Sequence, residues 1–105
     1  MSEQHYDRET HDLFTDSPAD RFMAFHRANP HVYKTLVIKA RQWRRRHPNR
    51  TVGIRMLWEA MRWDLLMQTD AVDYKLNDHY TSFYARMILD CEPDLKGIFN
   101  IRGRA

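Results

Sequence analysis

The side chains of this sequence that can do chemistry are mostly arginines, and they gather between Lys34 and Arg62. Nine basic residues in this segment stand against one acid, Glu59, so the segment carries a charge of +8 while the whole chain carries +3. Phosphates bind such a segment without special geometry, because each contact with a basic side chain releases a condensed counterion. Nucleic acid is therefore the first candidate partner. The candidate contacts are Lys34, Arg41, Arg44, Arg45, Arg46, Arg50, Arg55, Glu59 and Arg62.

An enzyme is not expected from the remaining reactive side chains. The three glycines are too scattered for a phosphate-binding loop, and the six histidines lack both the His-x₃-His spacing and the cysteine pair typical of zinc sites. Cys91 falls on an apolar helix side, which indicates a buried thiol. Asp90, Glu92 and Asp94 could bind a cation, but they are interpreted more simply as solvated charges. We expect no enzymatic activity, no metal and no cofactor.

Length and composition predict one soluble domain. The 105 residues suit a single core, and no apolar run approaches the roughly 18 residues of a membrane helix. A single cysteine is typical of a reducing compartment, so we expect a cytoplasmic protein. Residues 1–16 carry a net charge of −4 and are expected to be a flexible acidic tail. The domain is expected over residues 17–101, and 102–105 as a frayed end.

Four helices are predicted to position the basic side chains. Ser17-Pro18-Ala19-Asp20 is a helix start with a capping serine, and Asn29-Pro30 ends that helix and begins the next. The second helix is expected from Pro30 to His47, because Pro48 stops it. The third is expected from about Thr51 to Trp63, with Ile54, Leu57, Trp58, Met61 and Leu65 as its buried stripe. The fourth is expected from His79 to Cys91.

A short β-hairpin is predicted between the third and fourth helices. The turn-like segment 69–73 separates two apolar pieces, Leu66–Thr69 and Tyr74–Asn77, although the alternative is a longer third helix and a plain loop. A terminal strand is expected over 98–101. The fold class is thus mainly α, with a helix-turn-helix pair and a hairpin in a winged-helix-like order. In such folds the second helix of the pair enters the major groove of DNA.

These elements assign roles to the candidate contacts. Arg55, Glu59 and Arg62 on the third helix would meet base edges, since arginine offers a bidentate fork to guanine and glutamate accepts from cytosine. The arginines of the second helix and Arg50 would contact phosphates. The favoured function is duplex DNA binding, regulatory or architectural, although the sequence does not separate DNA from RNA. A basic face that is merely solvated is the alternative.

A second hypothesis is a protein-interaction adaptor. Trp63 points away from the stripe of the third helix, beside Met56, and exposed tryptophan near arginine is favoured at interface centres. The partner would be a host protein, and a homodimer would use the same surface. The alternative is that Trp63 packs beneath a neighbouring element.

The stretch from Phe25 to Phe99 resembles a family of small uncharacterised proteins of bacteria and their phages. The resemblance is carried by Phe25-His26 with Asn29-Pro30-x-Val32-Tyr33, Leu57-Trp58-Glu59 with Arg62-Trp63, Lys75-Leu76-Asn77, Tyr84-Ala85-Arg86 and Glu92-Pro93-Asp94-Leu95. It implies a helical domain in a bacterial or phage-infected cytoplasm. It implies no established activity and no functional residues.

Overall fold

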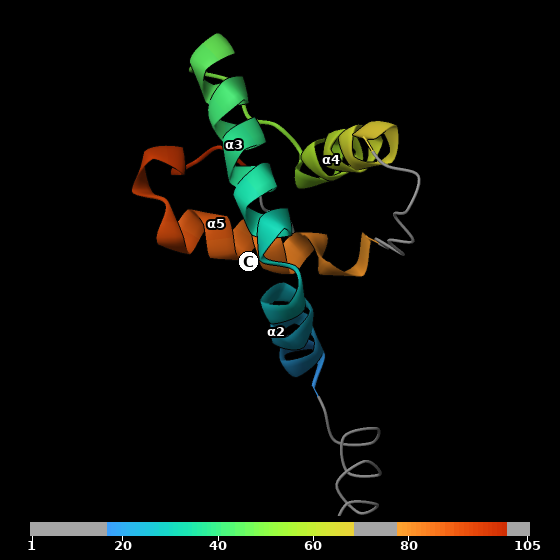
Figure 1. Cartoon of the computed structure of the whole chain (residues 1–105). Helices are drawn as coiled ribbons and strands as arrows, with labels where there is room; N and C mark the ends of the chain where they lie inside the picture. Colours follow the sequence, from blue (N-terminus) through green and yellow to red (C-terminus); the bar gives the residue numbers. More distant parts are fainter. Residues whose placement is uncertain (1–16, 69–77, 101–105) are drawn as a thin grey trace, which may run out of the picture.

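The regular structure of this protein is helical in the residues that the computed structural model describes, 17–68 and 78–100. Figure 1 shows the α-helices α2 (Pro18–Ala28), α3 (Pro30–Arg46), α4 (Ile54–Gln68) and α5 (Thr81–Cys91), with the short 3-10 turns η1 (Asp78–Tyr80) and η2 (Pro93–Leu95). The mainly helical class is confirmed. No helix within the described ranges is long and apolar enough to cross a membrane. The expected acidic tail and frayed end lie outside these ranges.

The junctions around α2 follow the sequence pattern. The Ser17 hydroxyl accepts from the Asp20 amide, and the Asp20 carboxylate accepts from the Ser17 amide, so the predicted capping box is present. Asn29 ends α2, and Pro30 begins α3 at a bend in the chain (Figure 1). α3 then runs to Arg46, one residue short of the predicted end, before the Pro48 connection.

The predicted β-hairpin is wrong, and with it the winged-helix-like order. Leu66 to Gln68, most of the proposed first strand, is the last turn of α4, and Thr69 and 74–77 lie outside the described residues. The physical reason is that Leu65 continues the apolar stripe four residues after Met61, so burial against the core favours helix here. α4 also begins at Ile54 rather than Thr51.

Among the described residues, an isolated parallel β-bridge takes the place of the terminal strand expected over 98–101, of which residue 101 lies outside those ranges. Val52, in the α3–α4 connection, bridges to Phe99, and its amide donates to the Ile98 carbonyl at 2.9 Å. Both partners are buried. The apolar character of residues 98–99 therefore serves core packing, and the bridge joins the residues after η2 to the start of α4.

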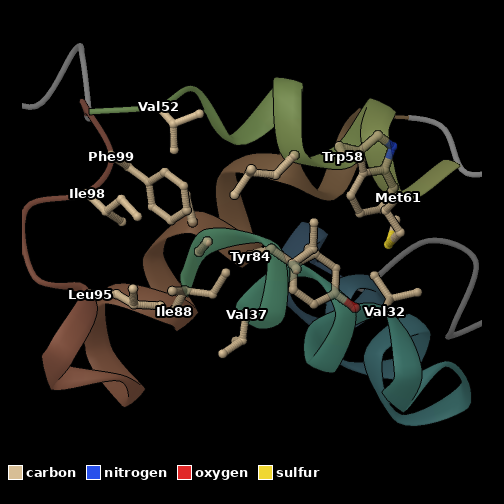
Figure 2. Close-up of a cluster of buried hydrophobic side chains, with 14 of the residues drawn as sticks. Val32, Val37, Val52, Trp58, Met61, Tyr84, Ile88, Leu95, Ile98 and Phe99 are labelled. Carbon is tan, nitrogen blue, oxygen red and sulfur yellow. The ribbon is translucent and has the colours of Figure 1, made fainter. Parts of the chain in front are cut away.

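The core gathers side chains from all four α-helices, with Phe22 as the member from α2, and Figure 2 shows members from α3, α4 and α5. α3 packs against α2 and α4, and α4 packs against α5. Trp58 from α4 and Tyr84 from α5 are fully buried, with ring centroids 5.9 Å apart. The valines of α3 meet them from one side, and the η2 region closes the core with Leu95, Ile98 and Phe99.

The buried side of α5 does not include Cys91. Thr81, Tyr84, Ala85 and Ile88 are buried, and Cys91 is exposed. The prediction of a buried thiol is therefore wrong. Phe83 and Met87 are apolar but only half-buried, so the apolar side of α5 is wider than its contact with the core. An apolar helix side was therefore not enough to predict burial of Cys91.

Candidate functional site

Arg41, expected to contact phosphate, is neutralised by carboxylates of the chain itself. Its Nε and one terminal nitrogen donate to the two Asp94 carboxylate oxygens at 2.8 and 3.0 Å, and that terminal nitrogen also donates to Glu92 at 2.7 Å. The hydrogen bond from Arg41 holds the pKa of Asp94 below its usual value. Glu92 and Asp94 were expected to be solvated charges, and the structure instead joins them to α3.

Arg44 is held by the same segment through backbone groups. Its two terminal nitrogens donate to the carbonyls of Asp94, at 3.2 Å, and Lys96, at 3.0 Å. This guanidinium therefore satisfies carbonyls at the end of η2, and it is not free to meet a phosphate without losing those bonds.

Tyr33 completes this cluster. Its hydroxyl donates to Glu92 Oε2 at 2.7 Å. The pKa of Tyr33 is raised, mainly by burial of the hydroxyl and next by its hydrogen bond to Glu92. We call Tyr33, Arg41, Arg44, Glu92 and Asp94 the α3–η2 cluster. The bonded partners are 50 to 59 residues apart in sequence, so the sequence contains no local sign of the cluster.

Three more basic residues have partners close by. Lys39 Nζ lies 2.5 Å from an Asp64 carboxylate oxygen and joins α3 to α4. Arg62 and Glu59, both expected at base edges, pair with each other at 2.9 Å. Arg50 lies over the ring of Trp43, 5.7 Å from the centroid, and its carbonyl accepts from the Trp43 indole nitrogen.

A smaller set of cations is left outside these contacts. Lys34, Arg45 and Arg46 are exposed on α3, and no carboxylate of residues 17–68 or 78–100 pairs with them. Arg55, at the start of α4, is exposed too, but it does interact with a neighbouring group. The nine predicted contacts thus do not form one uniform face, because Arg41, Arg44, Arg50, Glu59 and Arg62 take part in contacts within the chain.

The strongest surface feature is apolar and lies on α4. Met56, Ala60, Trp63 and Met67 follow one another at intervals of four, three and four residues, which places them along one side of the helix. We call these four residues the α4 seam. Met56, Trp63 and Met67 are 60%, 66% and 69% exposed. The core stripe with Leu57, Trp58 and Met61 occupies the opposite side.

A surface pocket of about 270 Å³ adjoins one half of the seam. Met56 and Ala60 line it from α4, and Trp43 and Arg46 line it from α3. The half of the seam with Trp63 and Met67 does not contribute to this pocket. The seam therefore has a hollowed N-terminal half and a projecting C-terminal half.

Besides Arg44 Nε, two buried side-chain atoms have no hydrogen-bond partner among the described residues. They are the Tyr84 hydroxyl and His26 Nδ1, in rings whose centroids are 5.8 Å apart. Burial raises the pKa of Tyr84. Neither residue lines the pocket between α3 and α4 or the one beside Tyr80, so we assign them no site.

Comparisons with protein-family models, curated proteins and solved structures found no match for this chain. The resemblance to small bacterial and phage proteins therefore stays a prediction. The function has to be argued from the α4 seam and the distribution of charge.

Proposed function

We propose that this chain is a protein-interaction module that receives a helix of a partner protein along the α4 seam. The observation that carries the proposal is the exposure of Trp63 in line with Met56 and Met67, on the side of α4 away from the core. Tryptophan and methionine are enriched at interface centres, and tryptophan is among the commonest residues that dominate binding energy.

The spacing of the seam supports a helical partner. Intervals of four, three and four residues are those of a coiled-coil seam, and amphipathic helices bind through anchors at these intervals. α4 already buries one apolar stripe in the core, so the seam is a second stripe on the same helix. A second stripe adds nothing to the core, and an exposed apolar surface of this kind is typical of interaction sites.

Nucleic-acid binding has less support. A phosphate at Arg41 would have to displace Glu92 and Asp94, and one at Arg44 would have to displace two carbonyls. An adaptor requires none of these contacts to break. The single cysteine and the resemblance to bacterial and phage proteins favour a bacterial cytoplasm as the place where such an adaptor would act.

A synthetic amphipathic helix tests the proposal. The probe is a tryptophan-free peptide of about three heptads with leucine at the seam positions. Binding should shift the fluorescence of Trp63 to shorter wavelength in a saturable way. Met67→Ser should weaken binding by about tenfold, as expected for loss of one large anchor.

Ile38→Ser is the matched control, because Ile38 is an equally prominent apolar residue, 57% exposed, on α3. It should leave the affinity unchanged. Equal losses in the two variants, or no loss in either, would contradict the seam as the binding surface. Circular dichroism checks that both variants keep their helices.

A further inference from the structure

We infer that the α4 seam receives a second copy of this chain, with the two α4 helices antiparallel. The inference rests on the proposed function and names its partner. It follows from the arrangement of large and small side chains along the seam and from the charges beside it.

The seam is complementary to itself under a two-fold rotation. If the axis passes midway between Ala60 and Trp63, each Ala60 lies opposite the other copy's Trp63, and each Met56 lies opposite a Met67. The largest side chain of the seam thus faces the smallest. An interface between identical copies needs such self-complementarity, because both copies present the same surface.

The pocket beside the seam lies where this rotation requires it. Met56 and Ala60 line the pocket between α3 and α4. Trp63 and Met67, both about two-thirds exposed, are the residues that the rotation brings over that half of the seam. The projecting half of one copy therefore covers the hollowed half of the other.

The charges beside the seam are also complementary. Glu59 and Arg62 form an ion pair within α4, with 61% and 40% of their side chains exposed. The same rotation places Glu59 of one copy at nearly the same height along the helix as Arg62 of the other. The two Arg62 side chains then lie side by side between the two Glu59 carboxylates, so each arginine has an acid of the other copy within reach, whereas a parallel arrangement would set Glu59 against Glu59 and Arg62 against Arg62 at equal heights.

The size of the seam predicts a weak, reversible dimer. The three large side chains of the seam, Met56, Trp63 and Met67, offer on the order of 100 Å² each, and thus about 300 Å² per copy. A standard interface buries about 800 Å² per partner. Contacts from α3 around the pocket would add to the seam. We expect a micromolar dissociation constant, visible as a molar mass that rises with concentration.

The test is a charge-swap mixing experiment by sedimentation equilibrium. Glu59→Arg and Arg62→Glu each set like charges against one another in the dimer, so each should weaken self-association by about fivefold. Each also loses the ion pair within its own helix. Mixing the two variants should restore association, because only contacts between copies become complementary again.

Crosslinking checks the orientation. In a Cys91→Ser background, Met56→Cys and Met67→Cys are mixed, with a tag on one to separate the products by mass. An antiparallel pair gives mainly the mixed disulfide. A parallel pair gives mainly like-with-like products and would overturn the inference.

The remaining outcomes separate this inference from the proposed function. A chain that stays monomeric up to about millimolar concentration but binds the helical peptide overturns the dimer and leaves the interaction module standing. A monomer whose Trp63 is shielded from acrylamide and does not bind the peptide overturns both, since the seam would then be covered within its own chain. If Met67→Ser and both charge variants associate as strongly as the native chain, the copies must meet through another surface. That result also overturns the inference.

Discussion

Arg41 and Asp94 form a two-bond fork between α3 and η2, with donor–acceptor distances of 2.8 and 3.0 Å. The pair joins segments that are 53 residues apart. The pair alters the interpretation of the basic segment between Lys34 and Arg62. The positive charge of this segment suggested nucleic acid as a partner, but acids of the same chain balance part of it.

The fork should contribute to stability, although both residues are partly exposed. Arg41→Ala should lower the melting temperature by a few degrees, because it leaves Glu92 and Asp94 without their shared cation. Arg45→Ala is the matched control, since Arg45 is exposed on the same helix and no carboxylate of the described residues pairs with it. Equal melting temperatures for the two variants would show that the fork contributes nothing. Thermal unfolding followed by circular dichroism measures the difference.

The contribution of Asp94 should depend on pH. Because its pKa is lowered in the folded protein, its stabilisation is fully present above the pKa of the unfolded chain, about 3.9. It is lost as the pH falls through the lower folded value. The free energy of unfolding should therefore differ between the native chain and Asp94→Asn by a constant amount above about pH 5, and this difference should shrink below about pH 4. Urea unfolding across this range measures it, and a difference that grows on acidification would contradict the assignment.

The buried Tyr84 hydroxyl should be dispensable. It has no hydrogen-bond partner among the described residues, so Tyr84→Phe removes a desolvated polar group and should leave stability unchanged or raise it by about 1 kcal/mol. Tyr33→Phe should instead lose about 1 kcal/mol, because the Tyr33 hydroxyl donates to Glu92. Urea unfolding compares the two variants. A loss above about 1 kcal/mol in Tyr84→Phe would reveal a bond from this hydroxyl.

Duplex DNA should bind at most weakly and without sequence preference. Lys34, Arg45 and Arg46 are the α3 cations that remain outside the contacts described, so the log–log dependence of affinity on salt should be no steeper than about −3. Arg45→Glu with Arg46→Glu should remove most of this binding. A slope near −4 to −5 would require Arg41 and Arg44 to leave the α3–η2 cluster, and it would favour the nucleic-acid hypothesis. Fluorescence anisotropy with a labelled duplex measures the slope.

Local patterns in the sequence predicted the helices well. The capping box at Ser17 and Asp20 and the stop at Asn29-Pro30 depend on residues within one turn, and both were read correctly. The stripe with Leu57, Trp58 and Met61 was also correct, because burial follows helical periodicity. That periodicity placed Met56 and Trp63 away from the core, as the structure has them.

Contacts between distant segments could not be predicted in this way. Glu92 and Asp94 look solvated in sequence because their partners lie on another helix. The hairpin was predicted from a turn-like segment, but Leu65 extends the helix through the residues before it. Met67 was missed as a member of the seam for the same reason, because the helix was expected to end at Trp63.

The bridge between Val52 and Phe99 bears on how the chain acquires its structure during synthesis. Val52 precedes α4, yet its amide is held by a residue that the ribosome adds much later. α3 and α4 can coil as soon as they emerge, but Leu95, Ile98 and Phe99 must follow before the core closes. Until then the core side chains of α4 lack the partners that residues 95–99 supply, so the core cannot close before this late segment has been synthesised.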